Sequence, residues 1–122
     1  MTVYFLSDNT AEMEHYYAEK EYRNDIMLEI DNLYYEVYFF TKDALEYEMT
    51  RDGFFAFPCM IILDEISTEK IIKSIVELEK RGFFNKFKGM AQLDEEKRFM
   101  HNWYVNELSP YDMTKIKILK IE

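Results

Sequence analysis

The stretch MLEIDNLYYEVYFF, residues 27–40, decides the fold. Two runs of β-forming residues, 27–31 and 33–40, meet at Asp31-Asn32, a pair that favours turns. Successive side chains of a strand point to opposite faces, so the second run has an apolar side and a side rich in tyrosine. The apolar side holds Leu33, Tyr35, Val37 and Phe39, and the other side holds Tyr34, Glu36, Tyr38 and Phe40. The stretch therefore predicts two adjacent strands with one face toward a core.

The same sheet is predicted to continue along the chain. Residues 45–49 alternate strictly between apolar side chains and glutamates, and residues 54–63 form an almost wholly apolar run. Asp52-Gly53 lies between these runs and is a strong hairpin signal, because glycine accepts the positive φ of a tight turn. Pro58 marks a bulge, a break or an edge position. We therefore expect an antiparallel meander over residues 26–63.

Helical periodicity predicts three helices. The clearest covers residues 68–81, where Ser67 can cap the N-terminus and Gly82 can close the C-terminus. The other two are expected over residues 10–23 and within residues 93–108. The residues expected in the core are Ile72, Ile75, Val76, Leu33, Val37, Phe39, Ile61 and Leu63.

Shorter elements are expected at both ends of the chain. Val3–Leu6 is a β-rich run that predicts a strand, and Thr114–Ile121 alternates lysines with isoleucines in the manner of a lysine-guarded edge strand. The three aromatic residues after the clearest helix are expected to pack back on the core. They are Phe83, Phe84 and Phe87.

Composition indicates one folded domain of the α+β class, residues 1–122, in which helices cover one face of the β-meander. Hydrophobic residues make up 48% of the chain and aromatic residues 17%, which excludes general disorder. The single cysteine cannot form an internal disulfide, so a stapled mini-domain is excluded. The longest apolar run, residues 54–63, is about half of what a membrane-spanning helix needs. Residues 1–8 also lack the pattern of a signal peptide, so we expect a cytoplasmic protein.

Charge is distributed unevenly along the chain. The formal net charge is −9, yet residues 1–65 hold 15 Asp or Glu against 4 Lys or Arg. Eight of the ten tyrosines lie in this acidic half. An acidic field repels nucleic acid and anionic lipid and attracts basic surfaces, and tyrosine is favoured in protein-binding patches. We therefore expect a basic protein partner, with no direct binding to nucleic acid or membrane.

No motif in the sequence fixes a catalytic chemistry, so no catalytic, cofactor-binding or metal-binding residue is predicted. The three glycines cannot form a phosphate-binding loop or a dinucleotide fingerprint. Cys59, His15 and His101 are too few for a closed zinc site. Cys59 is expected to be a small buried hydrophobe within an apolar strand. Asp64-Glu65 could in principle hold a metal, but a strand end before a helix start accounts for the pair.

The predicted partner-binding residues are those that project from the outer side of the meander. They are Glu29, Asp31, Tyr34, Glu36, Tyr38, Glu46 and Glu48. Like charges opposite one another across strands are destabilising, and a basic partner would relieve that repulsion. Two alternatives stay open: the helix over residues 10–23 covers this face, or the partner binds that acidic helix itself. The acidic side chains of the helix are Glu12, Glu14, Glu19 and Glu21.

The profile of the chain resembles the small cytoplasmic immunity proteins that neutralise bacterial toxins, including those of contact-dependent growth inhibition. The segments Leu28–Asp31, Phe57–Glu65 and Arg81–Phe84 carry the resemblance, which is one of type and transfers no residue role. It implies a non-catalytic acidic α+β domain that blocks a basic toxin domain, often a nuclease. Two other functions remain: a nucleic-acid mimic that inhibits a host defence enzyme, and a small-ligand carrier or enzyme with a deep polar pocket.

Overall fold

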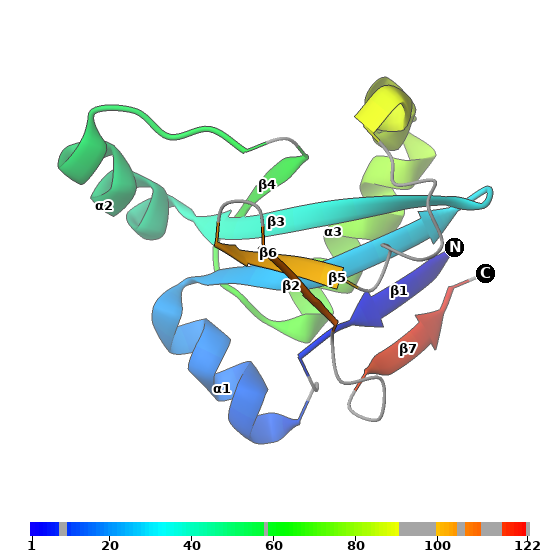
Figure 1. Cartoon of the computed structure of the whole chain (residues 1–122), viewed down its shortest axis with the longest axis horizontal. Coiled ribbons are helices and arrows are strands. Elements are labelled where there is room, and N and C mark those ends of the chain that lie inside the picture. Colours follow the sequence, from blue (N-terminus) through cyan, green and yellow to red (C-terminus); the bar gives the residue numbers. More distant parts are fainter. Residues whose placement is uncertain (8–9, 58, 91–99, 105–106, 111–115, 122) are drawn as a thin grey trace.

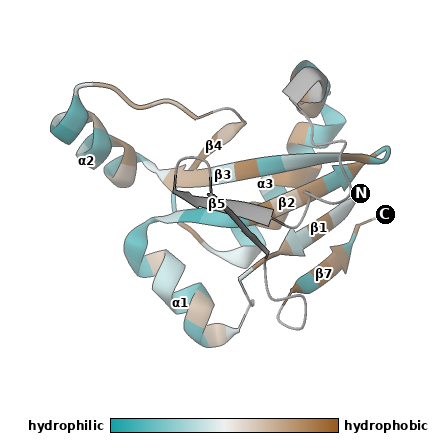
Figure 2. Ribbon diagram, viewed as in Figure 1, coloured by the Kyte–Doolittle hydropathy of each residue, from teal (hydrophilic) through white to brown (hydrophobic). Residues whose placement is uncertain are grey.

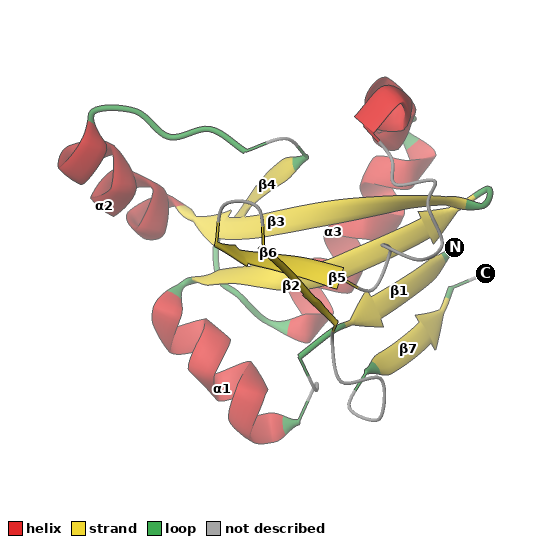
Figure 3. Ribbon diagram, in the orientation of Figure 1, coloured by secondary structure: helices red, strands yellow, loops and turns green. Residues whose placement is uncertain are grey.

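A five-stranded sheet with strand order β4-β3-β2-β1-β7 forms the centre of the protein (Figures 1 and 3). This computed structural model describes residues 1–7, 10–57, 59–90, 100–104, 107–110 and 116–121. The elements are β1 (Thr2–Phe5), α1 (Ala11–Lys20), β2 (Tyr22–Ile30), β3 (Leu33–Thr41), α2 (Lys42–Asp52), β4 (Met60–Leu63), α3 (Thr68–Lys80), the 3-10 helix η1 (Phe83–Met90), β5 (Met100–Tyr104), β6 (Glu107–Pro110) and β7 (Lys117–Lys120). The predicted α+β class is confirmed.

The strand pair predicted from residues 27–40 is present. β2 and β3 are antiparallel, with Leu28 opposite Tyr35 and Glu29 opposite Tyr34. The turn residues Asp31 and Asn32 both have positive φ, at 51° and 64°, as a tight two-residue hairpin turn requires. The meander predicted over residues 26–63 is therefore confirmed only for the β2–β3 pair, and β1 pairs antiparallel with β2 on the other side.

The expected strand over residues 45–49 is wrong, because these residues lie in α2. The local capping signals account for the helix. The Thr41 side chain accepts a hydrogen bond from the Ala44 N–H at 3.3 Å, and Gly53 ends the helix with φ at 81°. Gly53 is therefore a helix C-cap rather than the hairpin turn that we expected. The capping residues on both sides of the segment favour a helix more strongly than alternation over five residues favours a strand.

β4 also differs from expectation, because it runs parallel to β3 and covers only Met60–Leu63. A parallel neighbour needs a crossover connection, and α2 together with residues 53–57 forms part of it. Residues 54–57, expected in the strand, form an extended linker instead. Pro58 lies outside the described residues.

The core lies between the sheet and α3, which Figure 1 shows behind the strands. The predicted helix over residues 68–81 is confirmed: Ser67 caps it, and the Lys70 N–H donates to the Ser67 hydroxyl at 3.2 Å. Ile66 and Ile71 are both buried, in the arrangement of a hydrophobic staple. Figure 2 shows hydrophobic and hydrophilic colours mixed along β1, β2 and β3 and mainly hydrophilic colours on α1 and α2.

Every predicted core residue is at least partly buried. Ile75, Val37, Phe39 and Ile61 are fully buried, and Leu33, Leu63, Ile72 and Val76 are half-buried. The aromatic residues that follow α3 pack together as expected: Phe84 is buried, and its ring centroid lies 5.2 Å from that of Phe83. The Phe87 ring centroid lies 5.1 Å from that of Phe83.

The helix predicted within residues 93–108 is wrong where the structure describes it. Residues 100–104 and 107–110 form β5 and β6, an antiparallel pair in a sheet of their own. Leu93 and Phe99 lie outside the described residues. The predicted edge strand at the C-terminus is confirmed as β7, which pairs with β1 and exposes Lys117 and Lys120.

A buried ion pair that the sequence analysis missed lies where β2 bulges. Arg23 is 0% exposed and Asp25 1% exposed, and the Arg23 Nε donates to the Asp25 Oδ1 at 2.8 Å. The guanidinium lies 4.9 Å from the Phe5 ring centroid and 4.7 Å from that of Tyr17. The pair therefore ties β2 to β1 and α1 in an apolar setting.

Candidate protein-binding surface

The sheet face opposite α3, here called the outer face, gathers four of the predicted site residues. Glu29 comes from β2, and Tyr34, Glu36 and Tyr38 alternate along β3. Glu36 is exposed, and the other three side chains are half-buried. Asp31 is exposed in the turn between the two strands. Alternation along the two strands was sufficient to predict this grouping.

Tyrosine hydroxyls hold the two outer-face carboxylates. The Tyr4 hydroxyl of β1 donates to the Glu29 Oε1 at 2.7 Å, and the Tyr38 hydroxyl donates to the Glu36 Oε2 at 3.0 Å. Burial raises the pKa of Tyr38, and the negative charge of Glu36 raises it further. The phenol therefore stays protonated as a donor, and each carboxylate is held in one orientation.

The expected repulsion between opposed carboxylates is not found in the described sheet register. Glu29 stands opposite Tyr34 on one side and Thr2 on the other, and Glu36 stands opposite Met27. The acidic side chains are therefore offset diagonally rather than paired directly. The predicted folding cost of directly opposed carboxylates therefore does not arise between these strands, and the phenol donors further stabilise both charges.

Glu46 and Glu48 do not join the outer face as predicted. Both lie on α2, where Glu46 is 3.7 Å from the Lys42 Nζ and Glu48 pairs with Arg51. Arg51 also contacts Asp52, with Nη2 and Oδ2 2.9 Å apart. The physical reason is the helix itself: residues that would alternate across a strand are distributed around α2 instead.

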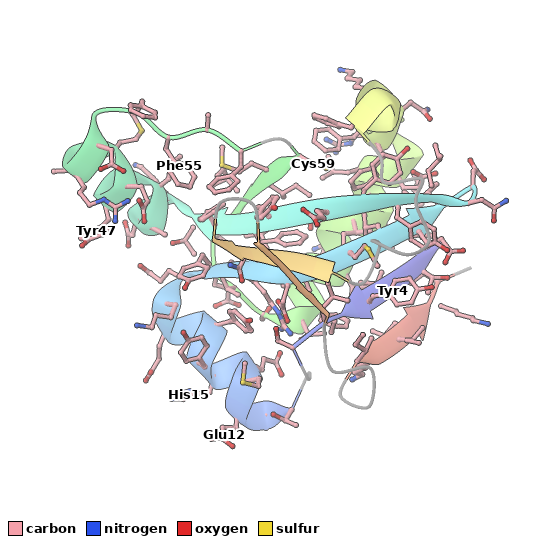
Figure 4. All side chains as sticks on the ribbon, viewed as in Figure 1. Tyr4, Glu12, His15, Tyr47, Phe55 and Cys59 are labelled. Atoms are coloured by element: carbon pink, nitrogen blue, oxygen red, sulfur yellow. The ribbon has the colours of Figure 1, made fainter. Side chains whose placement is uncertain are left out.

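An aromatic band runs from α1 across the outer face. It consists of Tyr16, Tyr17, Tyr22, Phe40, Phe55, Phe57 and Tyr38, and consecutive ring centroids lie 4.7 to 6.4 Å apart. Phe55 and Phe57 are on the extended linker, and Figure 4 shows Phe55 on the linker's β3 side. Two residues apart in an extended segment, both rings can reach the sheet. Their role was not predicted, because the apolar pattern of residues 54–63 predicted one continuous strand.

The exposed residues of the outer face include Glu36 on β3, Ile62 on β4, and Ile118 and Lys120 on β7. Figure 1 shows the β5–β6 hairpin in front of β2 and β3, on the outer-face side of the sheet. Met27, which pairs with Glu36 in the register, is only 1% exposed, whereas Glu36 itself is exposed. A partner that approaches this face would therefore meet a carboxylate flanked by aromatic rings.

α1 does not cover the outer face. The Glu14 Oε1 accepts a hydrogen bond from the Thr68 N–H at 3.0 Å, which ties α1 to the start of α3. This hydrogen bond lowers the pKa of Glu14. Of the other acidic residues of the predicted helix, Glu12 and Glu19 are exposed, and Glu21 is the C-cap at φ 60°. The helix ends at Lys20, earlier than the predicted residue 23.

The structure describes the surroundings of three candidate reactive side chains, those of Cys59, His15 and Asp64. Burial raises the pKa of the Cys59 thiol to about 11, so the thiolate is scarce at neutral pH. The Nε2 of His15 lies 3.0 Å from the Glu19 Oε1 on the exposed surface of α1 (Figure 4). His101 is in β5 rather than in the expected helix, and its side chain lies outside the described residues. Asp64 contacts the Lys70 Nζ at 2.7 Å, and this hydrogen bond lowers the pKa of Asp64.

Within the described ranges, no group of three His, Cys, Asp or Glu side chains is placed to hold a metal ion. An open hollow of about 250 Å³ lies between α3 and the end of β2, with Val76, Glu79 and Ile30 in its lining. Small-molecule sites usually have volumes of roughly 300–1,000 Å³ and are more enclosed. The described helices include none that is both long and apolar enough to cross a bilayer.

Comparisons with known proteins add no family to this description. A scan against protein-family models, a search of curated proteins and a search of solved structures each found no match to the chain.

Proposed function

We propose that this protein is a non-catalytic inhibitor that binds and neutralises a basic bacterial toxin domain, as immunity proteins do. The observation that carries the proposal is the pair of tyrosine-held carboxylates, Glu29 and Glu36, on a sheet face next to an aromatic band. The net charge of −9 adds long-range attraction for a cationic partner. We place the protein in the cytoplasm, where the free thiol of Cys59 would stay reduced.

The fixed geometry of the carboxylates suits them to a binding role. A side chain that is already oriented loses less conformational entropy when a partner binds, so more of the interaction energy appears as affinity. Glu36 is exposed and accepts a hydrogen bond from Tyr38, and the Phe57 ring lies 4.7 Å from the Tyr38 ring. Aromatic anchors beside charged groups form the energetic centre of many protein interfaces. A basic domain could therefore make ionic and apolar contacts at the same part of this surface.

The direct test uses the protein domain encoded by the adjacent gene. That domain is produced with and without this protein, and growth of the host and formation of a purified complex are measured. We expect growth inhibition by the domain alone, rescue by co-expression, and a complex that blocks the domain's activity. Absence of binding by the wild-type protein would overturn the proposed function.

Two matched charge reversals locate the contact. Glu36→Lys changes the outer face, and Glu77→Lys makes the same change in net charge on α3, which packs on the other side of the sheet. Glu77 is exposed, and its ion pair within the described part of the chain is with Arg81 at the end of the same helix, so its loss has little effect on stability. We expect Glu36→Lys to weaken binding by about tenfold or more and Glu77→Lys to change it less than about threefold. Equal effects of the two reversals would contradict the outer-face assignment.

A further inference from the structure

The segment Lys42–Phe57, here called the arm, comprises α2 and the linker after it. None of the α2 side chains is buried. Seven large hydrophobic residues of the described chain are exposed, and five of them lie in or just after the arm. These five are Tyr47 (66% exposed), Met49 (49%), Phe54 (73%), Phe57 (43%) and Ile62 (44%). Exposed apolar residues scattered singly are normal, but a concentration of this kind marks an interaction site.

The position of α2 is unusual for a crossover helix. A helix that connects two parallel strands normally packs on the sheet and buries its apolar face there. α2 connects β3 to the parallel strand β4, yet it projects from the end of the sheet (Figure 1). Figure 4 shows Tyr47 pointing outward from this helix. A helix of 11 residues gains little stability from its own hydrogen bonds in water, so a packing partner would benefit it.

We propose that the arm anchors the basic partner, with Phe54 and Tyr47 inserted into an apolar cleft that has a cationic rim. This inference rests on the proposed function and adds the chemistry of the cleft. The arm carries four acidic residues against Lys42 and Arg51, and no Lys or Arg occurs from Asp52 to Glu69. The charge around the exposed rings therefore complements a basic surface rather than a second acidic copy of this chain.

Phe57, the last residue of the arm, connects the arm to the outer face. Phe57 lies 4.7 Å from the Tyr38 ring and 6.0 Å from the Phe40 ring, measured between centroids. Tyr38 in turn donates to Glu36. One partner can therefore contact the arm and the outer-face carboxylates together, with aromatic rings at the centre and charged groups at the rim.

The test is Phe54→Ala, measured as the dissociation rate from the domain encoded by the adjacent gene. Phe54 is the most exposed of these rings, so its truncation leaves the fold intact, which circular dichroism verifies. The matched control is Ile118→Ala, because Ile118 is 52% exposed on β7: it shares the outer face with Glu36 but lies at the opposite edge of the sheet from β4 and the arm. We expect Phe54→Ala to raise the dissociation rate about 30-fold, the size of an interface hot spot, and Ile118→Ala to change it less than about threefold.

The possible outcomes separate the two proposals. If the wild-type protein binds the domain and Phe54→Ala dissociates at the wild-type rate, the arm is not the anchor, while the proposed function stands. If the wild-type protein does not bind, both proposals fail. Sedimentation of the protein alone adds a further check: a wild-type dimer that Phe54→Ala converts to a monomer would mean that a second copy covers the arm, and would overturn the inference.

Discussion

Replacing Arg23 by Met should destabilise the protein by about 3–5 kcal/mol, because it leaves the Asp25 carboxylate buried without its cation. The Arg23 side chain is 0% exposed, and it donates to Asp25 through Nε at 2.8 Å and Nη2 at 3.3 Å. After the substitution, the donor that remains to the Asp25 carboxylate among the described residues would be the Ser7 N–H, 3.3 Å from Oδ2. One long hydrogen bond compensates only part of the penalty of burying a charge.

Urea unfolding followed by circular dichroism measures this loss. With a slope of about 1.5 kcal/mol per molar urea, a loss of about 4 kcal/mol lowers the midpoint by roughly 2–3 M. The double variant Arg23→Met/Asp25→Asn removes both charges and keeps an acceptor for the Ser7 N–H. We expect it to recover at least half of the lost stability, since an apolar replacement of a buried pair is often close to neutral. Arg23→Lys keeps the charge without the planar fork, and its stability should lie between those of the wild type and Arg23→Met.

The pair itself should contribute little net stability. The Arg23 Nη1 has no hydrogen-bond partner among the described residues, so part of the desolvation penalty of the guanidinium is not recovered. The reasoning would be refuted if Arg23→Met lost less than about 1 kcal/mol, or if the double variant were as unstable as the single one.

Three further predictions concern packing, pH and reactivity. Ile75→Ala should lose about 2–5 kcal/mol in urea unfolding, because Ile75 is 0% exposed; a loss below about 1 kcal/mol would contradict its burial. The lowered pKa of Glu14 means that its stabilising contribution is complete above about pH 4.3 and is lost as the pH falls through the folded-state pKa. Glu14→Gln should therefore be less stable than the wild type at pH 7, and the difference should shrink as the pH is lowered through the folded-state pKa of Glu14; a constant difference would exclude the linkage. Cys59→Ala and His15→Ala should neutralise the partner at the wild-type level in growth assays, and loss of neutralisation by a folded variant would support a catalytic role.

The elements that could be predicted are those with strong local signals. The β2–β3 hairpin follows from alternation and from Asp31-Asn32, and α3 follows from the Ser67 cap and its apolar periodicity. α2 was predicted as a strand because its alternating residues fit a period of two. The signals that favour a helix were nevertheless present: Thr41 is an N-cap and Gly53 a C-cap. A short alternating run is therefore weak support for a strand when capping residues flank it.

Features that depend on distant pairing could not be predicted. The parallel pairing of β4 with β3 depends on contacts between strands that a crossover separates, which no local pattern encodes. The same holds for the site: alternation placed Glu29 and Glu36 on one face, but Tyr4 reaches Glu29 only through the register of β1 against β2. The role of the linker rings likewise depends on contacts across the sheet.

The association rate between this protein and the adjacent-gene domain, measured against salt concentration, tests the central claim most directly. If the acidic outer face attracts a basic partner, the wild-type rate should fall steeply as salt rises from about 10 to 500 mM, by roughly 10-fold or more. Glu36→Lys should associate more slowly at low salt and converge on the wild type at high salt. A wild-type rate that does not depend on salt, or a Glu36→Lys rate equal to it at low salt, would contradict the account.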